Sequence, residues 1–325
     1  MKKLIAASAA VLMTVTACGS GAYDATEIPP KPQPKAAAAP AAPVPCTDKT
    51  NPLASYTPEG AMPQPGAMPA GSYMKKIFDN KRLIAGVSAD SLHLGSRNPI
   101  SGQIEGFDID MIKAVAKAIF GNENAVELRV ISSPQRIPVL KDQTVDIVAR
   151  NMTINCARWK DIAFSAEYYR SGQKTLVPLD STAKSTKDPK LDGQTICAPA
   201  GSTSLDNLKA ENPNIIPITA DTDTGCLVLF QSGKAYGISG DDTVLAGDAA
   251  QDPYAKVLPE KAFSAEPYGL GMSKAHPEFV QFVNQVLEQM KADGRWMASY
   301  NKWLAPDLGD LKAPPAPVYG RPITP

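Results

Sequence analysis

The chain is poor in histidine and has no excess charge of either sign. His93 and His276 are the only two histidines among 325 residues, and they are far apart in sequence, without the spacing of metal ligands. Lysine plus arginine and aspartate plus glutamate number 33 each, so the formal net charge is zero. Two distant histidines make a histidine zinc site or a serine–histidine triad unfavoured. The chain has no excess of basic residues that would indicate nucleic acid binding. The composition therefore argues against catalysis and predicts neither a metal site nor a cofactor.

The sequence also lacks an apolar run of transmembrane length. The run from 4 to 15 follows two lysines and is too short to span a bilayer, and no later stretch reaches spanning length. Val15-Thr16-Ala17-Cys18 then matches the bacterial lipobox, which is cleaved before a lipid-bearing cysteine. An ordinary signal peptide with an incidental cysteine is the alternative, and the small residues before Cys18 favour the lipobox. We expect a lipoprotein signal peptide over 1–17 and a lipid anchor on Cys18 at the outer face of the cell membrane.

No Cys-x-x-Cys pair occurs, which disfavours a cysteine metal site. Apart from Cys18, the cysteines are Cys46, Cys156, Cys197 and Cys226. An even number in an exported chain predicts two disulfides, with three possible pairings. Four buried thiols are the alternative.

Proline and alanine dominate the segment from 18 to 72, and proline recurs in the tail from 306 to 325. This composition is typical of extended, poorly packed chain, so we expect a spacer at the N-terminus and a similar tail. The globular part then covers residues 73–305.

Apolar strands alternate with helical patterns twice within the globular part. The strands expected in the first half are 83–87, 126–130 and 145–149, and those in the second half are 194–198, 215–218 and 236–239. This alternation predicts an α/β fold with two lobes. We assign 73–170 and 268–305 to lobe one and 171–267 to lobe two, because the apolar stretch 268–272 reads as a strand that returns to lobe one. Asp108 precedes a helical pattern, and we expect it to be the N-cap rather than a ligand contact.

Three polar groups follow strands. Thr153 and Arg158 lie beyond 145–149, where a hydroxyl and a planar fork of donors suit a carboxylate. Gly201-Ser202-Thr203-Ser204 precedes a helix and offers amides and hydroxyls to an anion, although it lacks the lysine of a phosphate-binding loop. Asp241 follows 236–239 and can pair with an ammonium. A surface arginine, a plain helix cap and a capping aspartate are the structural alternatives, but together the groups match the zwitterion of an α-amino acid.

The chain resembles the extracellular solute-binding proteins of polar amino acid ABC transporters, family 3, and among them the lipid-anchored glutamate- or glutamine-binding proteins of actinobacteria. The resemblance covers about residues 75 to 305. It is carried by Gly106-Phe107-Asp108-Ile109-Asp110, Met152-Thr153-Ile154-Asn155 with Arg158, Phe164-Ser165 with Tyr168, Gly201-Ser202-Thr203, and Asp241. It implies a type II periplasmic-binding-protein fold, in which each lobe is a mixed, mostly parallel sheet flanked by helices and the ligand lies between the lobes.

The resemblance also implies roles for individual residues. Arg158 holds the ligand α-carboxylate, assisted by Thr153 and by Thr203 in the Ser202-Thr203 turn. Asp241 binds the α-ammonium, with Asn151 close by. Asn151 departs from the glycine or small residue that many members have at its position. The family has cysteines resembling Cys197 and Cys226, so we pair these two and leave Cys46 with Cys156.

The ligand side chain is less determined by the sequence. Glutamate or aspartate needs a cation, for which Arg97 and Arg150 are the candidates, with surface solvation or structural pairing as the alternative for each. Glutamine or asparagine needs only neutral partners. We expect a monomer that closes about hinges near 166–174 and 265–268 and passes its ligand to an ABC permease. The alternatives are delivery of a signal to a membrane sensor and, less favoured, an enzyme resembling arogenate or prephenate dehydratase on the same fold.

Overall fold

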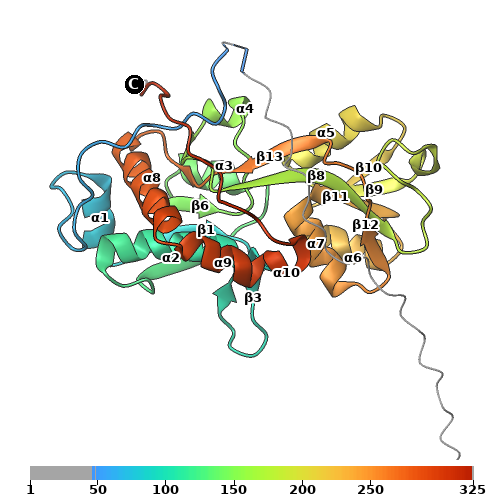
Figure 1. Cartoon of the computed structure of the whole chain (residues 1–325), viewed down its shortest axis with the longest axis horizontal. Helices are drawn as coiled ribbons and strands as arrows, with labels where there is room; N and C mark the ends of the chain where they lie inside the picture. Colours follow the sequence, from blue (N-terminus) through green and yellow to red (C-terminus); the bar gives the residue numbers. More distant parts are fainter. Residues whose placement is uncertain (1–45, 48, 324–325) are drawn as a thin grey trace, which may run out of the picture.

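A computed structural model describes residues 46–47 and 49–323. Two α/β lobes lie side by side, and each is built on its own sheet (Figure 1). The predicted α/β class with mixed sheets is thereby confirmed, but the sheets are not mostly parallel, because β8 (Tyr169–Pro178) and β14 (Gly271–Met272) pair with their neighbours in antiparallel fashion. The lipobox and Cys18 lie outside the described residues.

Lobe one contains a five-stranded sheet in the order β5-β1-β6-β14-β7. β1 pairs in parallel with β5 and β6, whereas β14 is antiparallel to β6 and β7. The strands are β1 (Leu83–Val87), β5 (Val126–Val130), β6 (Ile147–Ala149), β7 (Ala163–Phe164) and β14 (Gly271–Met272). A smaller three-stranded sheet comprises β2 (Asp90–Ser91), β3 (Gly95–Arg97) and β4 (Ile104–Glu105).

Lobe two contains a six-stranded sheet in which β10, β9 and β11 are parallel and β8 is antiparallel to β11, β12 and β13. Its strands are β8 (Tyr169–Pro178), β9 (Thr195–Pro199), β10 (Ile216–Ala220), β11 (Gly237–Asp241), β12 (Ala255–Val257) and β13 (Ser264–Tyr268). Because the carboxyl ends of parallel strands share one edge, the loops after β9 and β11 both face lobe one.

The helices of lobe one are α1 (Tyr73–Asp79), α2 (Phe107–Phe120), α3 (Arg136–Lys141), α4 (Cys156–Trp159), α8 (Pro277–Ala292), α9 (Arg295–Trp303) and α10 (Ala305–Leu308). Those of lobe two are α5 (Thr203–Glu211), α6 (Asp223–Gln231), α7 (Asp242–Gln251) and a short 3₁₀ turn, Pro189–Leu191. The long helix α8 carries apolar residues at helical spacing along one side, and Phe279, Val283, Val286 and Met290 are all buried.

Two strands carry the chain between the lobes. β8 leaves lobe one after Tyr169, and β13 returns to it, with Tyr169 paired to Tyr268 and Gln173 paired to Ser264 (Figure 1). These strands coincide with the two segments in which the sequence predicts hinges. Because the crossing strands are hydrogen-bonded along their length, they form a single ribbon between the two lobes.

Asp108 is not the N-cap that the sequence predicts. α2 begins at Phe107, and its N-cap is Gly106, with a φ of 143° that favours glycine. The buried carboxylate of Asp108 instead accepts hydrogen bonds from the Tyr168 hydroxyl at 2.6 Å and from the backbone N–H of Asn151 at 2.8 Å. Asp108 therefore fixes the backbone of the loop that follows β6.

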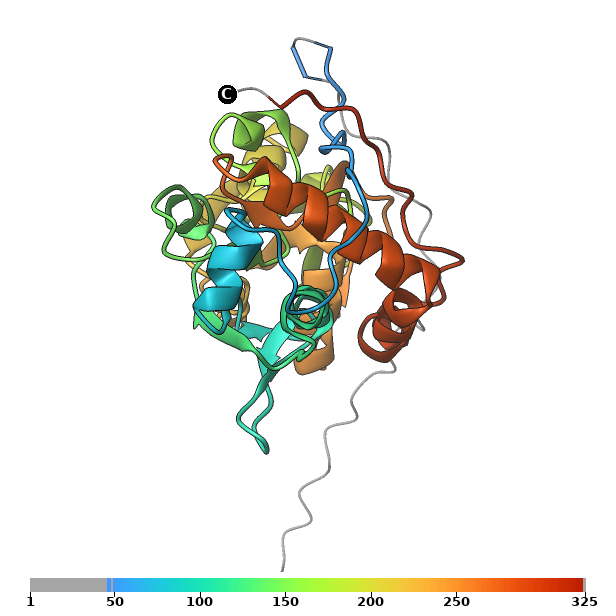
Figure 2. The same cartoon turned by 90° about the vertical axis from the view of Figure 1, so that its left-hand side faces the viewer.

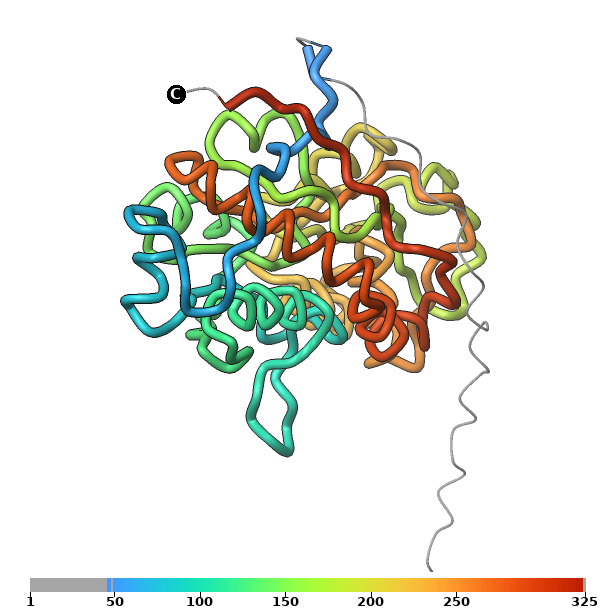
Figure 3. Tube along the Cα trace, turned by 60° about the vertical axis from the view of Figure 1, so that its left-hand side comes forward, coloured from blue at the N-terminus to red at the C-terminus, as the bar shows by residue number. Residues whose placement is uncertain are grey.

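The N-terminal segment also differs from the predicted spacer. From Asn51 to Ser72 the chain packs along lobe one as a strap, with Leu53, Tyr56 and Met68 in the core. The C-terminal tail runs beside it (Figures 2 and 3), and Ser55 pairs with Tyr319 in a parallel bridge. Backbone pairing between the two terminal segments, together with these apolar side chains, outweighs the loose packing that their composition favours.

The predicted disulfide pairing is confirmed. Cys46 is bonded to Cys156, and Cys197 is bonded to Cys226. The second bridge joins β9 to α6 within the core of lobe two. Among the residues that the structure describes, no helix is both long and apolar enough to cross a membrane.

Candidate functional site

A small, buried cavity lies where the two lobes meet. Lobe one lines it from the start of α3 and from the loop after β6, and lobe two lines it from the loops before α5, α6 and α7. The lining residues are Ser133, Arg136, Asn151, Thr153, Pro199, Ser202, Thr203, Ser204, Asp223, Gly240, Asp241 and Val244. Five of the predicted site residues are therefore brought together here: Asn151, Thr153, Ser202, Thr203 and Asp241.

Two acceptor atoms on the cavity wall have no hydrogen-bond partner within the described part of the chain. They are Oδ1 of Asp241 and Oδ1 of Asn151, both buried. The other oxygen of Asp241 accepts a hydrogen bond from the Tyr268 hydroxyl at 2.7 Å. Burial, reinforced by the negative charge of Glu266, raises the pKa of Asp241 well above its ordinary value. A buried acceptor without a donor is costly, so this pair of oxygens is suited to a ligand that brings several N–H groups.

The backbone of Asn151 is strained into the left-handed region, with a φ of 35°. Glycine adopts this region without cost and asparagine tolerates it better than most residues. The family preference for glycine noted above thus has a conformational reason. With this backbone, the carbonyl of Asn151 accepts a hydrogen bond from Arg136 while the residue lines the cavity.

Glu266 on β13 is a site residue that the sequence reasoning missed. Its Oε2 accepts hydrogen bonds from the hydroxyls of Thr153 at 2.6 Å and Thr203 at 2.7 Å. Its Oε1 accepts from Asn207 Nδ2 at 2.8 Å and from the Ser264 hydroxyl at 2.7 Å. The two threonines predicted to hold a ligand carboxylate therefore hold a carboxylate of the protein. The available signal was an acidic residue two positions before the stretch 268–272, which the sequence predicts to return to lobe one.

Arg158 lies behind the cavity wall rather than on it. Its Nη1 donates to the carbonyl of Thr153 at 2.7 Å, and its Nη2 is 3.5 Å from the carbonyl of Gly201 across the cleft. Burial lowers the pKa of Arg158, whereas the negative charges of Glu266 and Asp241 act in the opposite direction. The guanidinium supplies positive charge directly behind the two threonine hydroxyls.

Arg136, at the start of α3, is a second residue that the sequence reasoning missed. Its guanidinium donates to the carbonyls of Arg150 and Asn151 at 3.2 Å each and to the carbonyl of Gly201 in lobe two at 3.3 Å. Burial, with the nearby charges of Arg158 and Arg150, lowers its pKa to about 9. Arg136 lines the cavity and is the cation that reaches it most directly. Its place after β5, at the same edge as the loop after β6, could have identified it.

Neither of the two cations predicted to read a ligand side chain lines the cavity. Arg150 is completely buried beside the cavity. It donates to Ser133 Oγ at 2.6 Å and lies 3.6 Å from Asp223. Arg97 is exposed on the β3–β4 hairpin, where it donates to the carbonyl of Gly102 at 2.6 Å. The structure does not bring Arg97 to the cavity.

Direct contacts between the lobes show that the cleft is closed. Asp223 of lobe two accepts from the Ser91 hydroxyl of lobe one at 2.9 Å, and the Thr224 hydroxyl donates to the carbonyl of Asp90 at 2.6 Å. The Ser133 amide donates to the carbonyl of Asp221 at 3.0 Å. Residues 221–224 of lobe two therefore lie against lobe one beside the cavity, which is the arrangement of a binding protein that encloses its ligand.

Across residues 46–47 and 49–323, no group of three histidine, cysteine or acidic side chains is arranged to hold a metal ion. The chemistry of the site is that of matched charges and hydrogen bonds: a carboxylate and an amide oxygen on one side, and hydroxyls with guanidinium groups behind them on the other.

Comparison with known proteins identifies the family. Residues 83–306 match the model of the bacterial extracellular solute-binding proteins, family 3. The chain belongs to this family. The matched range includes all three sheets, both crossing strands and the whole cavity, so membership rests on the part of the chain that builds the site.

Two curated relatives are similar over most of their length. The chain is 34% identical over 231 residues to the ABC transporter glutamine-binding protein of Bacillus subtilis, which covers 71% of this chain and 84% of the relative. It is 28% identical over 254 residues to the glutamate-binding protein of Corynebacterium efficiens, covering 75% and 85%. The second relative is actinobacterial, in agreement with the resemblance given above.

A solved structure bears on the enzyme alternative. It is an ancestral amino acid-binding protein described as a precursor of cyclohexadienyl dehydratase, 31% identical, with a TM-score of 0.65 over 71% of this chain and 99% of that chain. Although this neighbour is described as the precursor of an enzyme, it is itself named as a binding protein. The two curated relatives are likewise named as binding proteins.

Proposed function

We propose that this protein binds a polar α-amino acid, with glutamine preferred, and delivers it to an ABC permease. The observation that carries the proposal is the pair of unsatisfied buried acceptors, Asp241 Oδ1 and Asn151 Oδ1, on the cavity wall. An α-ammonium supplies three N–H donors and a positive charge that can pair with the negative charge of Asp241. An ammonium that binds here gives both acceptors a donor and pairs the Asp241 carboxylate with a matching charge.

The α-carboxylate then binds at the two threonines. The hydroxyls of Thr153 and Thr203 converge on one carboxylate oxygen, and the positive charge of Arg158 lies behind them. The start of α5, at Thr203, adds backbone amides. Each hydroxyl has one proton, so the ligand takes the place of Glu266 on these hydroxyls, while Asn207 and Ser264 continue to hold Glu266.

Charge on the cavity wall favours a neutral ligand side chain. Asp223 and Asp241 contribute two carboxylates and Arg136 one guanidinium. Asp223 is already paired with Arg150, 3.6 Å away, and Arg136 donates to backbone carbonyls, so a side-chain carboxylate would be buried without a cation committed to it. A side-chain amide brings no charge and can both donate and accept. The relative from Bacillus subtilis is named for glutamine, which supports the same choice.

The output follows from the closed cleft. Contacts such as Ser91–Asp223 form only when the lobes meet, so the closed form presents a surface that the open form does not. Relatives named for ABC transporters support delivery to a permease rather than to a membrane sensor. We further propose that Cys18 carries lipid and holds the protein at the outer face of the membrane, as a monomer.

Isothermal titration calorimetry of the chain without residues 1–18, against each of the twenty amino acids, tests the proposal. We expect one-to-one binding of glutamine, with weaker binding of glutamate, aspartate and asparagine. If glutamate binds more tightly than glutamine, the charge argument for the side chain is wrong. If none of the twenty binds, the proposed function is wrong.

A further inference from the structure

The helix that carries Arg158 is too short to hold its own position. α4 has four residues, Cys156–Trp159, and a single turn is not stable by itself in water. One end is fixed by Asn155, whose side chain accepts from the Arg158 amide at 2.8 Å. The rest of its position must come from tertiary contacts, and on the side away from the cavity the two terminal segments of the chain provide them.

These segments form one unit, which we call the terminal clasp: residues 51–56 of the strap and 318–321 of the tail. The Ser55 amide donates to the carbonyl of Val318 at 2.9 Å, and the Arg321 amide donates to the carbonyl of Ser55 at 3.1 Å. The Arg321 side chain then donates to the carbonyls of Ala54 at 2.6 Å and Asn51 at 3.1 Å. Arg321 thus closes the clasp from the C-terminal side.

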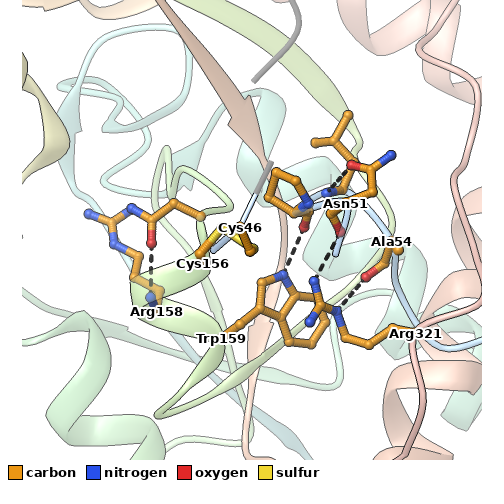
Figure 4. Close-up of a disulfide and its surroundings, with 10 residues drawn as sticks. Cys46, Asn51, Ala54, Cys156, Arg158, Trp159 and Arg321 are labelled. Carbon is orange, nitrogen blue, oxygen red and sulfur yellow. Dashed lines mark hydrogen bonds between the residues drawn. A yellow bond between two sulfur atoms is a disulfide. The ribbon is translucent and has the colours of Figure 1, made fainter. Parts of the chain in front are cut away.

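The clasp holds α4 through Trp159. The guanidinium of Arg321 lies 3.9 Å from the centre of the indole ring, and the indole N–H donates to the carbonyl of Pro52 at 2.9 Å (Figure 4). Tyr56 packs edge-on against the same ring at 5.9 Å. Three residues before Trp159, at the start of the helix, Cys156 is bonded to Cys46, with the Cα atoms 5.5 Å apart (Figure 4).

We infer that the terminal clasp positions Arg158 for ligand binding, with Arg321 as the positioning residue that acts through Trp159. Arg158 immediately precedes Trp159, and its guanidinium points to the opposite side of the helix, toward Thr153 and the cleft. The single turn α4 has few internal hydrogen bonds that would stop it from rotating about its axis. Such a rotation would move the Arg158 guanidinium away from the threonine hydroxyls. The inference rests on the proposed function, because it assigns the clasp to the same carboxylate site.

A double-mutant cycle tests the inference, with Arg321→Ala, Arg158→Ala and the combined variant titrated with glutamine well below their thermal midpoints. Arg321→Ala should weaken binding by roughly fivefold, and this effect should disappear in the Arg158→Ala background. Arg321→Lys, which retains a cation over the indole, should recover part of the affinity. Arg82→Ala is the matched control, because Arg82 is an exposed lobe-one arginine paired with Glu127 and distant from the clasp. It should bind as the wild type does.

The inference is overturned if Arg321→Ala lowers the thermal midpoint but leaves affinity unchanged, or if it weakens binding equally with and without Arg158. The Cys46→Ser/Cys156→Ser variant provides a second measurement, and its affinity loss should likewise require Arg158.

A third readout does not depend on ligand. Amide hydrogen exchange of the unliganded chain should speed up at 156–160 in Arg321→Ala and remain unchanged in Arg82→Ala. If the wild type binds no amino acid, the proposed function is wrong. Faster exchange in Arg321→Ala would still show that the clasp positions α4, and unchanged exchange would show that it does not.

Discussion

The hydroxyl of Thr153 lies 2.6 Å from Oε2 of Glu266 and donates its proton to that oxygen. Thr153 belongs to lobe one, Glu266 to a crossing strand, and Thr203, the other donor to the same oxygen, to lobe two. A single carboxylate oxygen therefore ties together both lobes and the ribbon that connects them. Glu266 makes at this point the kind of contact that a ligand carboxylate would make.

Glu266→Gln should tighten glutamine binding, by about threefold or more. The substitution keeps the shape but removes the negative charge that opposes an arriving α-carboxylate near Thr153 and Thr203. Calorimetry gives the affinity. Glu260→Gln is the matched control, because Glu260 is bonded to Thr186 and does not line the cavity. A weaker complex in Glu266→Gln would show that Glu266 assists the ligand instead of competing with it.

Asp241→Asn should weaken binding by about a hundredfold, because it leaves the ligand ammonium buried without a matching charge. The neighbouring Asp242→Asn serves as the control. Asp242 is also buried but accepts a hydrogen bond from Ser171 outside the cavity, so its loss should affect stability and not affinity. Equal affinity in Asp241→Asn and wild type would remove the ammonium site.

The same carboxylate predicts a pH dependence of binding. Burial raises the pKa of Asp241 in the unliganded protein, and an ammonium beside it lowers that pKa again. Ligand therefore binds the ionised form, and affinity should fall as the pH is lowered through the raised pKa. Calorimetry in buffers of different ionisation enthalpy should detect proton release on binding. Proton uptake would contradict the assignment.

Asp108 should make the unliganded protein less stable as the pH rises from about 4 to about 6. Burial raises its pKa from 3.8 to about 6, so the folded state binds the proton more tightly than the unfolded state. The stabilisation is complete below pH 3.8 and is lost as the pH passes through 6. Each tenfold change in proton affinity is worth about 1.4 kcal/mol, so the change approaches about 3 kcal/mol. Urea unfolding of wild type and Asp108→Asn across this pH range measures the difference between their free energies of unfolding. If the pKa of Asp108 is the same in the folded and unfolded states, this difference should not change with pH.

Arg136→Lys should weaken glutamine binding by roughly tenfold or more, because an ammonium cannot replace a guanidinium that reaches carbonyls in both lobes. Arg97→Lys is the same substitution on the exposed hairpin and should leave affinity unchanged. If the two variants bind equally, or if Arg97→Lys is the weaker one, the cation that lies near the ligand has been wrongly identified.

Sequence patterns were sufficient to predict the two-lobed architecture and the site residues that follow the ends of parallel strands. Strand–helix alternation predicts both lobes, and the residues after β6, β9 and β11 converge on the cavity because parallel strands place their carboxyl ends at a common edge. Thr153, Thr203 and Asp241 could be named for that reason.

Glu266 could not be found in the same way, whereas Arg136 was missed although it follows β5 at that common edge. Glu266 lies within a strand and reaches the threonines only because β13 crosses between the lobes, a relationship that depends on tertiary pairing with β8. Arg136 looks like an ordinary residue in the first turn of a short helix. The strap was mispredicted because proline and alanine report local chain stiffness, whereas the packing of 51–56 depends on the distant tail at 318–321.

A comparison of glutamine with Nα-acetylglutamine by calorimetry tests the central claim most directly. Acetylation removes the positive charge of the α-nitrogen and leaves it a single N–H donor, while the side chain and the α-carboxylate stay as they are. Because the site is built around the free acceptors of Asp241 and Asn151, glutamine should bind and the acetylated form should give no measurable heat of binding. Equal binding of the two compounds would contradict an amino acid site at this cavity.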